Sequence, residues 1–289
     1  FLEKLRAILS ANHYEDVEDT VAYYREMIMD KKENGENEAQ ILEELGSVER
    51  VASMILGKTV KEDDLTNNEM QYIEVNVKSI DCIVEASEVS EMVIDAPNEE
   101  LIEIITDGNT LRVSQINSMK FQLFSKPLQV YIQIPKKRKM RGIRMKGISS
   151  DFQVEGDLDC DEITLSTVSG DNKLKKVQVS NLNITSTSGD CKLKDCSMNE
   201  CYLKTVSGDI RTRHVSGYIM RSTSVSGDIK MKEIDFEKSF LKTTSGDIDA
   251  VVQGPESEYT VYKNKGNRGF GRKILELKTV SGDIDYSFI

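Results

Sequence analysis

The sequence predicts a mainly β protein: a three-sided parallel β-solenoid of about 19 residues per coil, preceded by a small all-α domain. Three observations carry this prediction. The tripeptide Ser-Gly-Asp occurs six times in the second half of the 289-residue chain. Between its copies, apolar and polar residues alternate, which is typical of strands with one buried face. In contrast, residues 1–57 carry apolar residues at helical spacing.

The first element is a helical domain over residues 1–57. Apolar residues from Leu2 to Leu9 mark one helix, and a second is predicted from about residue 15 to residue 32, ended by Asn34-Gly35. Shorter apolar runs predict a third helix that ends at Gly46 and a fourth that begins after Ser47 as the N-cap. Residues 58–69 are polar without periodicity, so we interpret them as a linker to a solenoid over residues 70–289.

The repeat defines the second element. Five of its glycines follow one another at intervals of 19 residues, and the sixth comes 36 residues later, which we interpret as two coils, one of them shortened. These glycines are the predicted structural turn residues: Gly170, Gly189, Gly208, Gly227, Gly246 and Gly282.

Within each period the alternation slips by one residue twice. A slip would turn every later side chain outward unless the chain bends there, so each coil should hold three strands and three corners. Coils must stack to bury their interiors, at about 4.8 Å per step. Residues 151–289 would give about seven coils, and residues 70–150 about four more or a flattened capping sheet. The general crossover preference predicts right-handed coiling.

Charge and composition exclude several classes of protein. The net charge is −11, of which −9 falls in residues 1–69 (8 basic against 17 acidic), and this acidity argues against a nucleic-acid partner. No apolar run is long enough to span a bilayer. Five cysteines are an odd, modest number that favours a reducing compartment. We therefore expect a protein that is cytoplasmic or peripheral to the membrane, or at the cell surface if a signal precedes Phe1.

Two stretches resemble known families. The first fifth of the chain, with Phe1, the Tyr23–Tyr24 pair and Leu45–Gly46, is similar to the HAAS-type helical signalling domain of bacteria. Residues 70–289 resemble the bacterial putative-adhesin family, through blocks such as TVSGDI at 205–210 and TTSGDI at 243–248 after the Ile134-Pro135 strand end. The first resemblance implies an accessory role beside regulators or membrane segments, and the second implies a β-solenoid of unknown function.

The aspartates of the repeat form the first candidate site. Stacked carboxylates repel one another, and Ca²⁺ would relieve this repulsion. The alternative is that each Asp accepts backbone N–H groups in its own turn, while a column of Lys and Arg two residues further on balances its charge. The single glycine per turn favours this alternative over a calcium ladder at Asp171, Asp190, Asp209, Asp228 and Asp247.

Other candidates are weaker. The Ser/Thr column that precedes the turns lacks a repeating His, so we expect a hydroxyl ladder between coils rather than nucleophiles. Cys191, Cys196 and Cys201 fall on apolar positions and should be small core residues. The irregular segment 253–272 is predicted to protrude as a ligand-contacting loop, with Lys263, Lys265, Arg268 and Arg272 as its candidate residues.

The predicted function is non-catalytic: a scaffold or binding module in a bacterial signalling or envelope-linked system. We expect a protein partner at residues 1–57, with no cofactor and no catalytic residue. The alternative is a solenoid that binds or cleaves carbohydrate. The acidic run at residues 157–162 would suit cleavage, but coils of constant length leave no long loops to frame a cleft.

Overall fold

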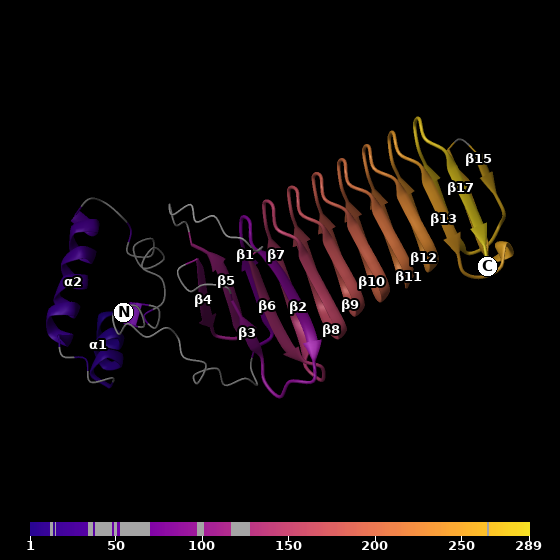
Figure 1. Ribbon diagram of the computed structural model, residues 1–289. Coiled ribbons are helices and arrows are strands. Elements are labelled where there is room, and N and C mark those ends of the chain that lie inside the picture. The colour runs from indigo at the N-terminus through magenta and orange to yellow at the C-terminus, as the bar shows by residue number, and fades with distance from the viewer. Residues whose placement is uncertain are drawn as a thin grey trace. The chain divides into compact units, whose positions relative to one another are not determined.

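The structure is a computed structural model. It describes residues 1–11, 14, 16–33, 37, 48, 51–52, 70–96, 101–116, 128–264 and 266–289. The chain divides into two compact units, residues 1–66 and 67–289 (Figure 1).

The first unit is helical. Helix α1 spans Leu2–Ala11 and helix α2 spans Val17–Glu33. Leu5 and Leu9 on α1 form a buried core with Val48, Val51 and Ala52. The predicted third helix, most of the fourth and the linker lie outside the described residues. None of the helices that the structure describes is long and apolar enough to cross a membrane.

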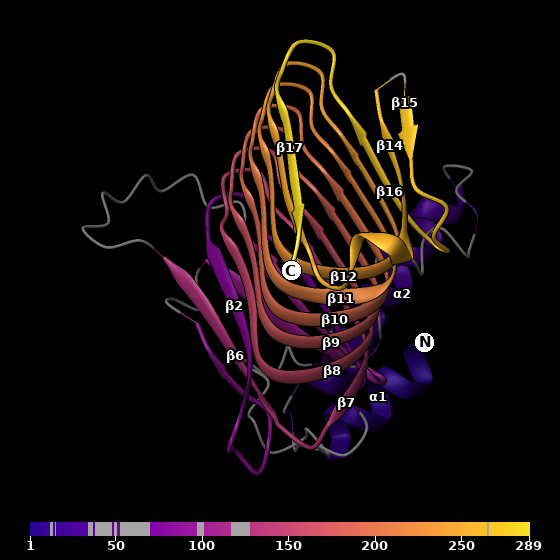
Figure 2. The ribbon, with the colours of Figure 1, turned by 90° about the vertical axis from the view of Figure 1, so that its right-hand side faces the viewer.

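The second unit is a parallel β-solenoid, as predicted. Its middle consists of five strands that each follow one coil: β8 (Phe152–Ser166), β9 (Asn172–Thr185), β10 (Cys191–Lys204), β11 (Ile210–Thr223) and β12 (Ile229–Lys242). Neighbours pair in parallel. From β9 to β12, residue i lies opposite residue i+19, as Cys191 with Ile210 and Ile210 with Ile229, whereas β8 begins at an offset of 20 from β9 (Phe152 opposite Asn172). Seen along the stack, successive coils lie one behind the next with a similar outline (Figure 2).

Each of these strands bends where the alternation slips. The sixth residue after a turn glycine has the left-handed backbone conformation, with φ of 54° at Lys176 and Asp195, 52° at His214 and 57° at Glu233. Asp157 in β8 has φ of 51°. A left-handed residue reverses the side-chain alternation, so apolar residues on both sides of it point inward. This bend accounts for one of the predicted corners.

The interior is filled by the alternating apolar residues. Ile210, Val215 and Met220 illustrate the inward positions of one coil, and each is at most 1% exposed. All five cysteines are buried free thiols. Burial raises the pKa of Cys82, Cys160 and Cys191 to about 12, so these thiols stay protonated and behave as small hydrophobic residues.

The N-terminal end of the solenoid departs from the expected stack of four coils. Its strands are β1 (Tyr72–Asn76), β2 (Asp81–Ser87), β3 (Val93–Asp95), β4 (Ile102–Asp107), β5 (Thr110–Gln115), β6 (Gln129–Pro135) and β7 (Lys139–Lys146). β1 lies between β5 and β7, and β2 lies between β6 and β8. The first strands in sequence are therefore inserted one step inside the stack, and the antiparallel strands β3 and β4 pair with β6 and β5.

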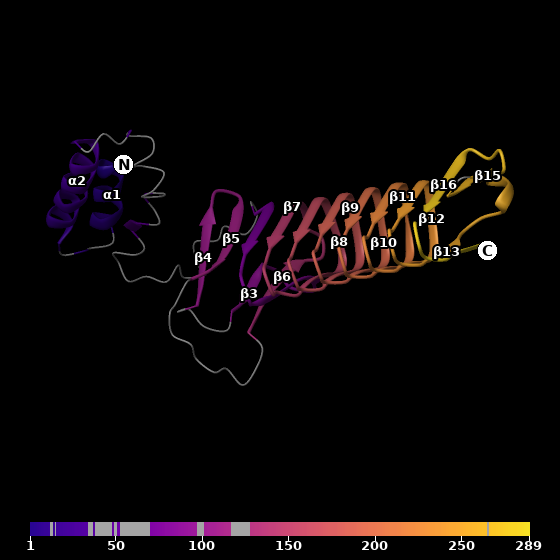
Figure 3. The same ribbon diagram turned by 90° about the horizontal axis from the view of Figure 1, so that it is seen from above.

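The C-terminal end also differs from the prediction. β13 (Ile248–Val252) pairs with β17 (Ile284–Phe288), so the 36-residue interval is a single step of the stack and not two coils. The extra residues form the short helix η2 (Glu256–Glu258) and strands β14 (Tyr259–Lys263) and β15 (Gly266–Arg268), which pair antiparallel. β16 (Lys273–Lys278) returns between β14 and β12. Figure 3 shows β15 and β16 at this end.

The turn glycines form one ridge along the stack. Neighbouring coils are too close at this ridge for any side chain to fit. A Cβ atom on Gly208 would lie 2.0 Å from the carbonyl oxygen of Gly189 in the preceding coil, and one on Gly227 would lie 1.9 Å from that of Gly208. The other turn glycines, from Gly170 to Gly282, show the same clash at 1.8–2.1 Å. Glycine is therefore required by the close approach of neighbouring coils.

Substitution Gly208→Ala should destabilise the solenoid by more than about 3 kcal/mol, because the added methyl forces two coils apart. Urea unfolding followed by circular dichroism measures this. The matched control is Gly266→Ala in β15, where the nearest atom to the added Cβ is 3.9 Å away, so its effect should stay within about 0.5 kcal/mol. Equal stability of the two variants would contradict this account of the ridge.

Candidate functional site

The aspartates of the turns form a column that ties each coil to the next. Oδ1 of Asp190 accepts the backbone N–H of Asp209 at 2.9 Å, and Oδ1 of Asp209 accepts that of Asp228 at 2.8 Å. The same bond, at 2.8–3.0 Å, joins each member to the next along the column Asp81, Asp151, Asp171, Asp190, Asp209, Asp228, Asp247 and Asp283. The expected bond within one turn is thus replaced by a bond between coils.

The second carboxylate oxygens carry ion pairs. Nζ of Lys192 lies 3.0 Å from Oδ2 of Asp171 and 3.1 Å from Oδ2 of Asp190. Arg211 and Lys230 make equivalent pairs with Asp190, Asp209 and Asp228 at 2.5–3.0 Å. The sequence-predicted relief of repulsion by a basic column is present in the geometry.

These contacts lower the pKa of two aspartates. For Asp228, the backbone N–H of Asp247 is the largest cause, followed by the hydrogen bond from Lys230. For Asp190, burial raises the pKa, but the N–H of Asp209 together with Lys192 and Arg211 outweighs it and the pKa falls. Both carboxylates therefore stay ionised without a metal ion.

Both oxygens of Asp190 and Asp228 are engaged by protein donors. Across the residues that the structure describes, no group of three or more His, Cys, Asp or Glu side chains is arranged to hold a metal ion.

The Ser/Thr column forms a buried hydroxyl ladder beneath the turns. Oγ1 of Thr243 accepts the N–H of Gly246 in its own turn at 3.2 Å and donates to the carbonyl of Gly227 in the coil before at 3.0 Å. Thr279 repeats both bonds at 3.1 Å with Gly282 and Gly246. These hydroxyls form hydrogen bonds with buried backbone groups of the turns, which explains why a Ser or Thr recurs at this position of each coil.

The predicted ligand loop is largely part of the C-terminal end of the stack. Nζ of Lys263 donates to the carbonyl of Ile284 at 2.7 Å and lies 5.9 Å from the ring centre of Tyr286. Arg268 lies 3.7 Å from Glu256 in an exposed pair. Arg272 is exposed, and Lys265 lies outside the described residues. That this segment contacts a ligand stays a prediction.

The acidic run and His214 are also engaged in local pairs. Lys139 lies 2.8 Å from Asp161 and 3.9 Å from Asp159. His214 stands at the bend between Asp195 and Glu233 of the neighbouring coils, with ring nitrogens 2.9 and 2.7 Å from their carboxylates. Both arrangements join side chains of neighbouring coils.

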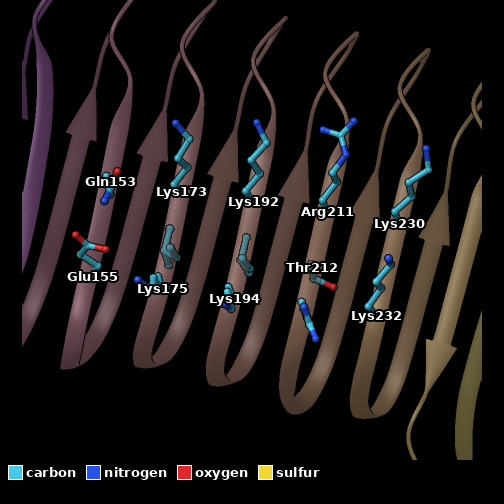
Figure 4. Close-up of a pocket in the computed structure, with 13 residues that line it drawn as sticks. Gln153, Glu155, Lys173, Lys175, Lys192, Lys194, Arg211, Thr212, Lys230 and Lys232 are labelled. Atoms are coloured by element: carbon cyan, nitrogen blue, oxygen red, sulfur yellow. The ribbon is translucent and has the colours of Figure 1, made fainter. Parts of the chain in front are cut away.

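The sequence analysis recognised one column of cations but missed that it belongs to a wider basic face on the outer wall of the first strand segment. Its cations form two columns, Lys173, Lys192, Arg211 and Lys230 in one and Lys175, Lys194, Arg213 and Lys232 in the other. Figure 4, which labels all of them except Arg213, shows the labelled cations as two rows across successive coils. Together with Gln153 and Glu155 they line a groove of about 550 Å³. The signal was present as the recurring pairs K-x-K and R-x-R at 19-residue intervals.

These features define a parallel β-solenoid with an N-terminal helical domain. The chain belongs to the family described as Toastrack DUF4097, which residues 70–270 match. Residues 1–54 match the family described as HAAS. The comparison with curated proteins finds no match.

Three solved structures are similar to this chain at low identity. A "putative adhesin" from Bacteroides fragilis NCTC 9343 is 21% identical, with a TM-score of 0.48, and the match covers 76% of this chain and 93% of that chain. A "putative adhesin" from Parabacteroides merdae ATCC 43184 is 15% identical, with a TM-score of 0.46 and coverage of 76% and 92%. A "putative cell adhesion protein" from Clostridium sporogenes ATCC 15579 is 12% identical, with a TM-score of 0.28 and coverage of 77% and 95%.

Removal of divalent cations should leave the stability unchanged, because protein donors already satisfy the aspartate column. The measurement is a thermal melt after dialysis against EDTA, compared with the same protein in millimolar CaCl₂. A midpoint that rises with calcium and returns with chelator would show that the column holds the ion.

Acid should weaken the Asp228 contacts. Its folded pKa is lowered from 3.8, so the stabilisation is fully present above that pH and is lost as the pH falls through the lower, folded value. Asp228→Asn should cost about 1 kcal/mol at pH 7, and the gap from wild type should narrow below pH 4.

The control for this pH experiment is Asp249→Asn, at an exposed position on β13. Denaturant unfolding from pH 7 to pH 3 compares the two variants with the wild type. A constant difference between Asp228→Asn and wild type over this range would contradict the assigned role of the carboxylate.

Proposed function

We propose that this protein is a non-catalytic binding module of a bacterial signalling or envelope-linked system. In this proposal, the helical unit docks a protein partner and the solenoid is a rigid scaffold. The non-catalytic part of the proposal rests on the constant coil length from β8 to β12. Five-residue turns join these strands, so no long loops stand beside the walls of this part of the solenoid. Catalysis on solenoids requires a framed cluster of groups, which such walls do not supply.

The helical unit supports a docking role through its exposed residues. Tyr23 and Met29 on α2 are 63% and 55% exposed. Tyr23, Glu26 and Met29 follow one another at intervals of three residues, which places Tyr23 and Met29 about 120° apart around the helix. Exposed aromatic and Met side chains are typical anchors in protein interfaces. The match to HAAS over residues 1–54 favours an accessory role, as the resemblance in sequence implies.

The test uses the full chain as bait in extracts of a bacterium that expresses it. Wild-type protein should capture a reproducible partner, and the variant Tyr23→Ala with Met29→Ala should lose at least tenfold of it, because its two apolar anchors are gone. The control is Arg25→Ala, an exposed polar position on the same helix, which should capture the partner normally.

Two outcomes would overturn the proposal. One is capture that the double variant leaves unchanged, which would move the interface away from α2. The other is release of reducing ends when the wild-type chain is incubated with polysaccharides, since turnover would establish the alternative, a carbohydrate-cleaving solenoid.

A further inference from the structure

We propose that the basic face of the solenoid binds an extended anionic glycan, a polysaccharide whose repeating charges are carboxylates or phosphates. This goes beyond the proposed function, because the face lies on the solenoid and the docking role was assigned to α2. Its cations are the two columns described above, eight residues on four consecutive coils.

Three of the four cations in the first column (Lys173, Lys192, Arg211 and Lys230) are held in place. Lys192, Arg211 and Lys230 are held by the aspartate column at 2.5–3.1 Å, and their side chains are 39–43% exposed. Pairing to Asp restricts the rotamers of these long side chains, so less conformational entropy is lost when a ligand arrives. The aspartates also neutralise part of the charge of this column, so its cations serve chiefly to position a ligand.

The second of the two columns carries the positive charge that is available to a ligand. Lys175, Lys194, Arg213 and Lys232 are all exposed. Of these, Lys194 lies 4.0 Å from Asp195, at the limit of an ion pair. Among the described residues, no carboxylate oxygen lies within 4.0 Å of the charged nitrogens of Lys175, Arg213 or Lys232. It presents cations at each strand step, about 4.8 Å apart.

This arrangement fits a single extended chain. Because residues i and i+2 of every strand share a face, the two columns run in parallel along the stack as a strip two side chains wide. The aspartate column of the turns borders the strip on one side. On the other side the bend residues are Asp195 and Glu233, alternating with Lys176 and His214. A flat anionic membrane would meet those borders, whereas a linear polyanion lies between them.

The lining chemistry favours a glycan over a nucleic acid. The residues that line the groove are Lys, Arg, Gln, Glu, Leu and Thr, and none of them is aromatic. Single-stranded nucleic acids gain about 1–3 kcal/mol per base from stacking on aromatic side chains, and this face has no platform for stacking. The groove instead offers cations and the methylene stems of lysines, which suit a charged polymer without aromatic bases.

The test measures fluorescence anisotropy of end-labelled oligogalacturonate and of a glycerol-phosphate polymer with the full chain. Wild type should bind at least one of them, more weakly at 200 mM than at 50 mM NaCl, because counterions are released on binding. The variant with Lys175, Lys194, Arg213 and Lys232 changed to Gln should lose about tenfold or more in affinity.

The control removes the same charge elsewhere. Lys137, Lys146, Lys204 and Lys242 are exposed cations outside the two columns, and their joint change to Gln should alter affinity less than about threefold. Circular dichroism checks that both variants fold, and the single substitution Arg213→Gln, with an expected loss of about two- to threefold, tests the face with minimal perturbation.

Three outcomes would overturn the proposal. They are absence of binding to both anionic polymers, equal losses in the two quadruple variants, and tighter binding to phosphatidylglycerol vesicles or to single-stranded DNA than to the glycans. Capture of the protein partner by α2 should be the same in wild type and both variants, so failure here is distinguishable from failure of the proposed function.

Discussion

The close approach of one turn to the next is the constraint on which the solenoid depends. A Cβ atom on each turn glycine would lie only about 2 Å from a backbone carbonyl oxygen in the turn of the preceding coil. That approach brings the backbone N–H of each Asp within reach of the carboxylate one coil earlier, and it buries the Ser/Thr hydroxyls beneath the turns. A side chain on the ridge would weaken all three sets of contacts at once.

Stacking also turns the charge of one coil into a column. Aspartates one strand step apart would repel strongly, and two sets of donors offset this: backbone N–H groups at Oδ1 and Lys or Arg at Oδ2. For Asp171, Asp190, Asp209 and Asp228, a cation is built into the same repeat, at the second position after the Asp.

The repeat made the solenoid, the ridge and the hydroxyl ladder predictable, because each depends on which residue recurs every 19 positions. The ends could not be predicted in the same way. That β1 and β2 lie inside the stack depends on pairing with β5, β6 and β7, which adjacent sequence does not encode. At the other end, the interval between Gly246 and Gly282 fits two coils by length alone, but the β14–β15 hairpin takes up the extra residues.

The basic face was missed for a different reason. Net charge is a sum over the whole chain, and −11 hides a strip of eight cations that stacking gathers on one wall. The first column was recognised only as a partner of the aspartates, and the second, two residues further on, was not considered. Because residues i and i+2 of a strand face the same way, the pair K-x-K in a stacked repeat always produces a double column. In a repeat protein, the local charge that a ligand meets is therefore set by the register of the coils. The sign of the net charge of the whole chain says little about it.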